Sequence, residues 1–312
     1  MSFFLVTGGA GFIGSNLVEA LLMRGEKVRV VDNFSTGKKE NLIPFLSDIE
    51  LIEGDIADPS ISKKAVKGVE YILHEAALGS VARSVDDPIA TNRANIDGTL
   101  NLLIAAKDEN IQRFVLAASS SCYGDSEELP KREDMPVNPL SPYAVTKLTQ
   151  EHYCKVFYHI YGLPTVILRY FNVYGPRQDP NSIYSAVVPI FISRLLKGER
   201  PTIFGDGEQS RDFTFVEDVV NANILACKTP NIEGEIFNIA YGQRITINKL
   251  FGIIRKRINS NLEPIYGDKR PGEVRHSLAD ISKAKKLMGY KSRFSIEDGI
   301  SKTIEYFIKK FN

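Results

Sequence analysis

A glycine-rich turn between two short apolar runs limits the fold of this chain more than any other feature. Phe3 to Thr7 is an apolar run of the length and composition of a buried parallel strand. The segment Gly8-Gly9-Ala10-Gly11-Phe12-Ile13-Gly14 follows it, and a helical pattern then continues to Gly25. A second apolar run, Val28 to Val31, ends at Asp32, about 20 residues after the glycines. This order of strand, glycine turn, helix, strand and acid predicts a dinucleotide-binding unit.

The chemistry of this unit favours NAD. Glycines let the backbone approach a pyrophosphate, and the helix N-terminus attracts its charge. We expect Asp32 to accept hydrogen bonds from the adenosine ribose and to repel a 2′-phosphate, which favours NAD over NADP. The residues of this region that we assign to the cofactor are Gly8, Gly11, Phe12, Ile13, Gly14, Asp32, Asn33, Ser35 and Gly37.

Further apolar runs continue the pattern of a parallel sheet. They are Ile49–Glu53, Val69–Leu73, Phe114–Ala118 and Thr165–Arg169. Ligands of such sheets bind beyond the carboxyl ends of the strands, so residues near these ends are expected to line a crevice. A simple loop acid is the alternative for Asp55, and His74 is interpreted as a packed rather than a catalytic histidine. The additional cofactor assignments are Asp55, Ile56, Ala76, Ala77, Leu78, Asn95, which lies on the helical segment Asn92–Lys107, and Tyr170.

A tyrosine and a lysine share one face of a predicted helix. Ser141 and Pro142 are typical of a helix start, and Tyr143 and Lys147 lie one turn apart in the helix that continues to about Tyr161. An ammonium beside a phenol favours the phenolate and lowers the tyrosine pKa from about 10, so the pair predicts a base. An ordinary surface pair is the alternative.

A run of serines ends the fifth apolar run. Burying Ser119, Ser120 and Ser121 without partners is costly, so we expect them to face the crevice and to hydrogen-bond a substrate oxygen. A plain polar turn is the alternative.

The pattern changes after Arg169 to short strands and helices. We predict an α/β fold in which residues 1–170 form the NAD-binding domain, a doubly wound parallel sheet of the Rossmann type with later segments contributing. Residues 171–312 are expected to form mainly a smaller α/β substrate lobe interleaved with the sheet. Because no Gly/Ser-rich linker separates the two, we expect them to share one core.

The composition is that of an ordinary cytoplasmic enzyme. The 312 residues carry a net charge of +1, which gives no electrostatic reason to expect nucleic acid or an anionic membrane as partner. Cys122, Cys154 and Cys227 lack metal-ligand spacing, so we expect reduced thiols and no metal site. The first residues have no basic segment typical of a signal peptide, and no apolar run reaches the roughly 18 residues of a membrane span.

These motifs together resemble the NAD-dependent UDP-hexose 4-epimerases of the extended short-chain dehydrogenase/reductase superfamily. The resemblance covers nearly the whole chain, in the segments Thr7–Gly14, Asp32-Asn33, Gly54–Ile56, Ala76-Ala77, Asn95, Ser119–Ser121 with Tyr123-Gly124, Tyr143 with Lys147, Arg169–Asn172, Gly205 with Arg211-Asp212, and Arg270–Glu273. The branch of UDP-N-acetylglucosamine 4-epimerases is the most similar, in Leu78–Val81, Ser119–Asp125, Arg177–Asn181 and Val274–Asp280.

The resemblance implies a mechanism and a substrate. Tyr143 would take and return the proton of the sugar 4-hydroxyl while NAD takes and returns the C4 hydride. Lys147 would hold the nicotinamide ribose as well, and Ser119 is the first choice for the reacting oxygen. The residues implied to bind a UDP-sugar are Gly79, Ser80, Asn172, Gln178, Val187, Val188, Thr202, Phe204, Arg211, Arg270, Glu273 and Ser277.

Ser277 bears on the choice of sugar. The resemblance to strict UDP-galactose epimerases has one difference here: those enzymes tend to have a bulky tyrosine at the position that matches Ser277. A small side chain at this position leaves room for an N-acetyl group on the sugar. A helix cap without substrate contact is the alternative.

Epimerisation of a UDP-uronic acid also stays open as a function. A 4,6-dehydratase is disfavoured because residues 119–121 contain no carboxylate, and a non-catalytic NAD sensor because Tyr143 and Lys147 are both present. A homodimer through the helices Asn92–Lys107 and Tyr143–Tyr161 is implied by the resemblance alone.

Overall fold

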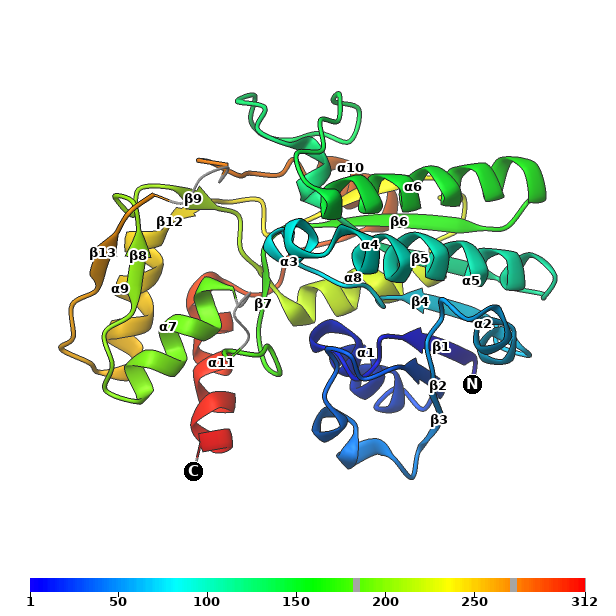
Figure 1. Cartoon of the computed structure of the whole chain (residues 1–312), viewed down its shortest axis with the longest axis horizontal. Coiled ribbons are helices and arrows are strands. Elements are labelled where there is room, and N and C mark those ends of the chain that lie inside the picture. The colour runs from blue at the N-terminus through cyan, green and yellow to red at the C-terminus, as the bar shows by residue number, and fades with distance from the viewer. Residues whose placement is uncertain (182–185, 270–273, 312) are drawn as a thin grey trace.

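The apolar runs of the sequence pair into a parallel sheet of seven strands, in the order β3-β2-β1-β4-β5-β6-β11 (Figure 1). The computed structural model describes residues 1–181, 186–269 and 274–311. The strands are β1 (Phe3–Thr7), β2 (Lys27–Asp32), β3 (Ile49–Glu53), β4 (Tyr71–His74), β5 (Arg113–Ser119), β6 (Thr165–Tyr170) and β11 (Ile236–Ile239). Their order reverses direction at β1 and β4, where a doubly wound sheet opens its ligand crevice.

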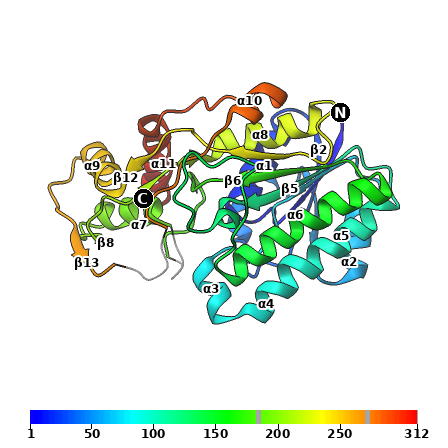
Figure 2. The same cartoon turned by 90° about the horizontal axis from the view of Figure 1, so that it is seen from above.

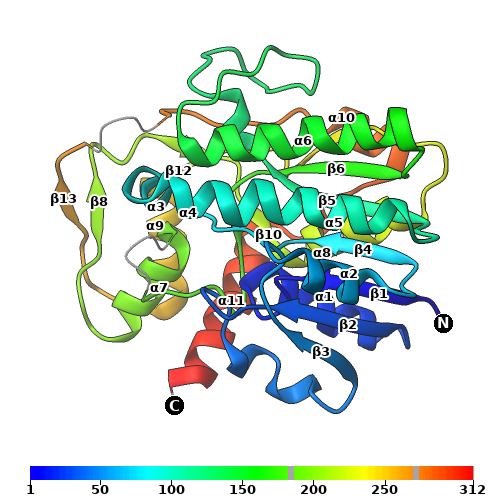
Figure 3. The ribbon, with the colours of Figure 1, turned by 45° about the vertical axis from the view of Figure 1, so that its right-hand side comes forward.

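Successive side chains along each strand point to opposite faces of the sheet, and each face packs against its own layer of helices. Phe4 and Val6 of β1 face one layer, and Leu5 between them faces the other. The first layer holds α1 (Phe12–Leu22), α8 (Val216–Lys228) and α10 (Ser282–Met288), and the second α2 (Pro59–Val66), α5 (Gly98–Lys107) and α6 (Pro142–Tyr161), as Figures 2 and 3 show. Helices α3 (Val81–Asp86) and α4 (Pro88–Asn92) pack against α6, and 3₁₀ turns occur at Lys39–Asn41, Ile43–Phe45 and Ser120–Tyr123.

A smaller lobe stands beyond the carboxyl edge of the sheet. Its helices are α7 (Val187–Leu196), α9 (Ile247–Ile258) and α11 (Ile296–Phe311). Its short strands are β7 (Val173–Tyr174), β8 (Thr202–Phe204), β9 (Ser210–Arg211), β10 (Thr214–Phe215), β12 (Ile245–Thr246) and β13 (Ile265–Gly267). They pair two by two, as β7 with β10, β8 with β13 and β9 with β12.

The predicted fold class is confirmed, and two details differ from the prediction. Ile236–Ile239, expected among the short strands of the lobe, is β11 and extends the main sheet by pairing in parallel with β6. The lobe also has its own buried apolar cluster, around residues such as Phe191, Phe215 and Phe307. The prediction of one shared core is therefore wrong: among the described residues the lobe has a separate buried cluster, and the half-buried side chains of Ile13 and Val173 pack against both clusters. Across the described ranges, no helix combines the length and the apolar composition that crossing a membrane requires.

Candidate active site

The glycine turn after β1 brings three segments closer together than side chains would allow. Gly8 has a φ of +66°, and a Cβ on it would lie 2.8 Å from the backbone of Ala76. A Cβ on Gly14 would lie 2.2 Å from the carbonyl oxygen of Gly8. Helix α1 begins after Gly11 without a side-chain cap, which leaves its first N–H groups available to an anion. A closed glycine cradle at an uncapped helix start fits a dinucleotide pyrophosphate.

Asp32 ends β2 beside this cradle, as predicted for the ribose-binding acid. Its carboxylate accepts hydrogen bonds from the backbone N–H groups of Ala10 (2.9 Å) and Phe34 (2.8 Å). Burial raises the pKa of Asp32, and these two hydrogen bonds oppose that rise. Gly37 lies so close that a Cβ there would be 2.9 Å from both carboxylate oxygens. Asp32 therefore fixes the loop after β2 against the glycine turn.

Two further cofactor assignments close local turns. The Asn33 Oδ1 accepts a hydrogen bond from the N–H of Ser35 (3.0 Å), and the Asp55 Oδ1 from the N–H of Ala57 (2.9 Å). The side chain of Ile56 is buried, and its carbonyl oxygen accepts hydrogen bonds from the Ser62 Oγ (2.8 Å) and the Asn101 Nδ2 (3.2 Å). These residues shape the crevice wall through turns of the kind that aspartate and asparagine favour.

Asn95 connects the chain after β4 to the helix that carries Tyr143. Its Oδ1 accepts from the N–H of Leu78 (2.8 Å), and its Nδ2 donates to the Thr146 Oγ1 (2.9 Å). The range Asn92–Lys107 is helical, as predicted, but it is not one regular α-helix: a π-helical turn, Arg93–Asp97, lies between α4 and α5. Fully buried and engaged on both sides, Asn95 positions the crevice wall.

Tyr143 and Lys147 lie on the first turns of α6, whose start is confirmed. The Ser141 Oγ caps this helix by accepting from the N–H of Ala144 (3.1 Å). The buried Lys147 Nζ donates to the carbonyl oxygen of Ala117 in β5 (2.7 Å), and burial lowers the pKa of Lys147 to about 8.

The pKa of Tyr143 differs from the expectation. Burial raises it, a hydrogen bond with the Ser119 side chain opposes the rise, and the nearby Cys122 and Glu75 add to it. The prediction that Lys147 lowers the pKa of Tyr143 is therefore wrong for the protein without ligand, because desolvation dominates.

The serine run separates into different roles. The Ser119 Oγ, at the end of β5, accepts from the N–H of Ser121 (3.2 Å), and the Ser119 side chain is close enough to Tyr143 to lower the pKa of the phenol. The Ser121 Oγ is buried and finds no partner in the part of the chain that the structure describes. Ser120 begins the 3₁₀ turn that re-aims the chain here. An unsatisfied buried hydroxyl at the carboxyl end of a parallel strand is the arrangement expected where a polar ligand completes the site.

His74 at the end of β4 and Glu75 directly after it have contrasting environments. His74 lies between the hydroxyls of Thr7 and Thr99, at 2.8 Å from each, and burial lowers its pKa to about 3, so the ring is neutral. Its interpretation as a packed histidine is confirmed. Glu75, which the sequence analysis did not select, is half-buried and accepts from the Tyr170 hydroxyl (2.8 Å). Its place directly after a parallel strand is the signal that pointed to it.

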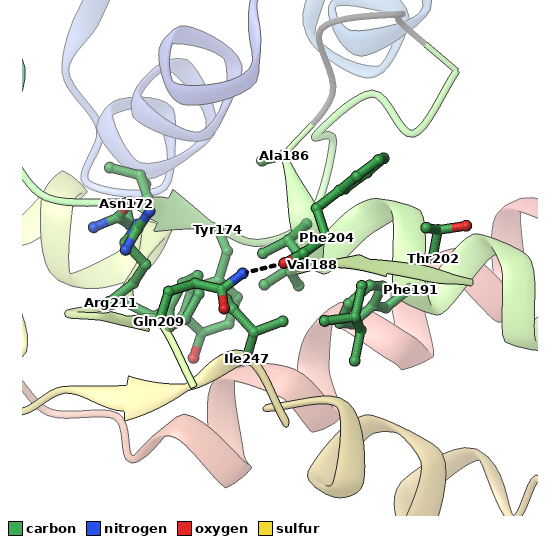
Figure 4. Close-up of a pocket in the computed structure, with 14 residues that line it drawn as sticks. Asn172, Tyr174, Ala186, Val188, Phe191, Thr202, Phe204, Gln209, Arg211 and Ile247 are labelled. Carbon is green, nitrogen blue, oxygen red and sulfur yellow. Dashed lines mark hydrogen bonds between the residues drawn. The ribbon is translucent and has the colours of Figure 1, made fainter. Parts of the chain in front are cut away.

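A cavity of about 250 Å³ in the lobe collects half of the residues predicted to bind substrate. The predicted ones that line it are Asn172, Val187, Val188, Thr202, Phe204 and Arg211. Figure 4 shows Asn172 and Arg211 together at one end of the cavity, with Thr202 and Phe204 toward the other. The lining also includes residues that were not predicted, among them Tyr174, Phe191, Gln209, Phe213 and Ile247. Their sequence signal was only that of apolar core or short loop.

Hydrogen bonds hold the polar end of this cavity. The Arg211 Nη1 donates to the carbonyl oxygen of Arg275 (3.0 Å), and the N–H of Ser277 donates to the carbonyl oxygen of Ser210 (3.0 Å). The segment with Ser277 therefore runs beside β9 and next to Arg211. The Asn172 Nδ2 donates to the carbonyl oxygen of Asp212 (3.2 Å), which ties the loop after β6 to the same strand.

The other predicted substrate residues lie outside this cavity or outside the described residues. Ser80 caps α3, accepting from the N–H of Arg83 (3.3 Å), and has a φ of +145°, a strained value for a residue with a side chain. Gly79 beside it is exposed. The Gln178 Nε2 donates to the carbonyl oxygen of Val173 (3.2 Å). Arg270 and Glu273 lie outside the described residues.

Comparison with known proteins places this architecture in a family. The NAD dependent epimerase/dehydratase family matches residues 4–240. A putative UDP-glucose 4-epimerase of Methanocaldococcus jannaschii is 41% identical over 304 residues, 97% of either chain. The UDP-N-acetylglucosamine 4-epimerase from Methanobrevibacter ruminantium M1, solved in complex with UDP-N-acetylmuramic acid, is 44% identical and superposes with a TM-score of 0.95 over 99% of each chain.

A third relative supports the same assignment. The UDP-glucose 4-epimerase from Thermotoga maritima, solved with UDP-glucose, is 40% identical, with a TM-score of 0.95 over 99% of this chain and 100% of that one. The glycine cradle, the uncapped start of α1 and Asp32 fit the cofactor that the family name specifies. This chain belongs to the NAD dependent epimerase/dehydratase family, and its cofactor is NAD.

Proposed function

We propose that this protein is a UDP-sugar 4-epimerase that interconverts UDP-GlcNAc with UDP-GalNAc, and UDP-Glc with UDP-Gal. One observation carries the proposal: the Ser119 side chain lies beside Tyr143 at the carboxyl end of β5, where it opposes the rise of the Tyr143 pKa, and the serine run there contains no carboxylate. That set can hold and exchange the proton of one sugar hydroxyl. It lacks the acid at residues 119–121 that a 4,6-dehydratase would use at C5 and C6.

The acid–base steps in this proposal belong to Tyr143. It removes the proton of the 4-hydroxyl and returns it after the configuration at C4 has inverted, while Ser119 hydrogen-bonds the same oxygen. NAD, when bound in its oxidised form, accepts and returns the C4 hydride and brings a positive charge that favours the phenolate. Lys147, held by the Ala117 carbonyl oxygen, supplies a second positive charge in the site.

The lobe is proposed to hold the UDP moiety while the sugar presents each face in turn. Arg211 suits the diphosphate because a guanidinium matches phosphate oxygens, and its placement beside Asn172 in the cavity supports this role. Phe204 and Thr202 are proposed to contact the uracil. Arg270 and Glu273 are proposed for the diphosphate and the uridine ribose on the resemblance alone. The small side chain of Ser277, close to Arg211, supports room for an N-acetyl group at C2.

Product analysis on a panel of substrates tests this function. The purified protein is incubated, without added reductant, with UDP-Glc, UDP-GlcNAc and their uronic acids, and Tyr143→Phe prepared in the same way is the control. We expect galacto epimers of the first two sugars from the wild type only. Release of a 4-keto-6-deoxy sugar would make the enzyme a dehydratase, and turnover of the uronic acids alone would establish the second candidate substrate class.

We also propose a homodimer formed through α5 and α6. Val145, Val156 and Ile160 lie on one face of α6 and are 47%, 44% and 68% exposed, and Ile104 of α5 is 45% exposed. Val156→Asp with Ile160→Asp should convert a dimer to a monomer in light scattering. Leu287→Asp, on an exposed apolar residue of α10, should leave the mass unchanged. A wild-type monomer would refute the proposal.

A cytoplasmic location is proposed on the state of the cysteines. Cys122, Cys154 and Cys227 are all free and buried, as expected in a reducing compartment. Fractionation of cells that express the full chain tests this, and recovery of the protein from an oxidising compartment would contradict it.

A further inference from the structure

A half-buried carboxylate, that of Glu75, lies across the strand end that carries Ser119. Glu75 follows β4 and Tyr170 ends β6, and these two strands flank β5 in the sheet. The hydrogen bond from the Tyr170 hydroxyl to the Glu75 Oε1 (2.8 Å) therefore spans the carboxyl end of β5. The mechanism proposed above gives Glu75 no role, yet it lies at the centre of the candidate site.

A third residue fixes the direction of this hydrogen bond. The Asn223 Nδ2 donates to the Tyr170 Oη (2.8 Å) and to the carbonyl oxygen of Val219 (2.9 Å). A carbonyl oxygen only accepts, so the Val219 contact identifies the amide nitrogen of Asn223. The Tyr170 oxygen accepts from that nitrogen, and its own proton is directed to Glu75. The network from α8 thus presents a fixed donor to Glu75 and favours its ionised form.

Charged and titratable groups face Glu75 from each neighbouring element. Lys147 and Tyr143 belong to α6, and Tyr170, which has Cys227 of α8 nearby, belongs to β6. His74 on its own strand is neutral. Burial raises the pKa of Glu75 to about 7, against the hydrogen bond from Tyr170 and the charge of Lys147. The charge of Glu75 in turn raises the pKa of Tyr143 and of Lys147.

We propose that Glu75 is a positioning carboxylate of this active centre, held by Tyr170 and Asn223, whose charge sets the pH range in which Tyr143 exchanges its proton and Lys147 keeps its charge. In its use of Tyr143 as the base, this inference rests on the proposed function. A negative charge favours the protonated form of both neighbours. Removing it therefore shifts the titration of both groups toward lower pH.

Glu75→Gln is the matched variant, because it keeps an oxygen that accepts from Tyr170 and removes only the charge. The holoenzyme is labelled with ¹³Cζ-tyrosine and titrated by NMR, with the Tyr143 resonance assigned by its loss in Tyr143→Phe. We expect the Tyr143 pKa to fall by about one pH unit, as for two charges in partial burial. Both limbs of the kcat/KM profile against pH should shift in the same direction. Glu70→Gln, which removes a carboxylate beside the opposite end of β4, should shift neither.

An unchanged Tyr143 pKa in Glu75→Gln, or an equal shift in Glu70→Gln, would overturn the inference. Tyr170→Phe serves as the second variant if Glu75→Gln does not fold. It removes the donor to Glu75, so the Glu75 pKa, followed with ¹³Cδ-glutamate, should rise. An unchanged Glu75 pKa in Tyr170→Phe would overturn the role given to Tyr170 and Asn223. Because NMR needs no turnover, a protein that epimerises no UDP-sugar would refute the proposed function while the shift still decides on Glu75.

Discussion

The sheet half and the lobe hold their candidate site residues in different ways. In the sheet half, Lys147 is anchored on β5, and Asn95 is engaged on two sides within a fully buried network. In the lobe, Arg211 lies on a strand of two residues, and Asn172 lies in the loop between β6 and β7. The difference suggests a division of labour, in which the proton chemistry depends on fixed distances and the substrate lobe can adjust to different sugars.

Removing the phenolic hydroxyl from the fixed half should have the largest effect. Tyr143→Phe should lower kcat about 10³-fold, because a positioned acid–base group contributes roughly 10²- to 10⁴-fold. Bound NAD should remain, since its cradle is the glycine turn and Asp32. Tyr161→Phe, at the exposed end of the same helix, should retain full activity. Wild-type turnover in Tyr143→Phe would exclude this residue from the mechanism. It would also contradict the assignment of the proton chemistry to the sheet half.

An ion pair in each half tests the difference in rigidity. Glu151 pairs with Arg169 through two hydrogen bonds (2.9 and 2.7 Å) and both are buried, whereas the lobe pair of Glu199 with Arg194 is exposed. Glu151→Gln leaves a buried guanidinium without its counter-charge and should lower the free energy of unfolding by about 3–5 kcal/mol. Glu199→Gln should cost about 1 kcal/mol or less. Urea denaturation measures both, and equal losses would contradict the proposed contrast.

A bulky residue in the lobe should have the smallest effect and change selectivity. Ser277→Tyr should reduce kcat/KM for UDP-GlcNAc about tenfold more than for UDP-Glc, because the ring would occupy the volume of the N-acetyl group. Ser277→Ala should affect the two substrates equally. An equal reduction of both substrates by the tyrosine would exclude Ser277 as the residue that admits the N-acetyl group.

Strong periodicity made the sheet half predictable from sequence. The predicted bounds of β1 and of the Tyr143 helix agree with the structure, because an apolar strand and a capped amphipathic helix each have a clear local pattern. The lobe cavity was predictable only in part, since its strands of two or three residues leave little pattern to detect.

Three features of the candidate site could not be predicted from the sequence, because they depend on contacts between distant parts of the chain. The raised pKa of Tyr143 reflects its burial, which residue spacing does not reveal. Glu75 and Tyr170 are 95 residues apart, and only the pairing of β4, β5 and β6 brings them together. The π turn around Asn95 depends in the same way on tertiary contacts, because its side chain connects Leu78 with Thr146.

Epimerisation in D₂O tests the central claim most directly. If Tyr143 exchanges only the 4-hydroxyl proton while the C4 hydrogen leaves and returns within the closed site, UDP-GlcNAc should give UDP-GalNAc without deuterium at any carbon. Mass spectrometry and proton NMR of the product measure this in one experiment. Deuterium at C4 or C5 of the epimer would show that a C–H proton passes through solvent, and would contradict the account.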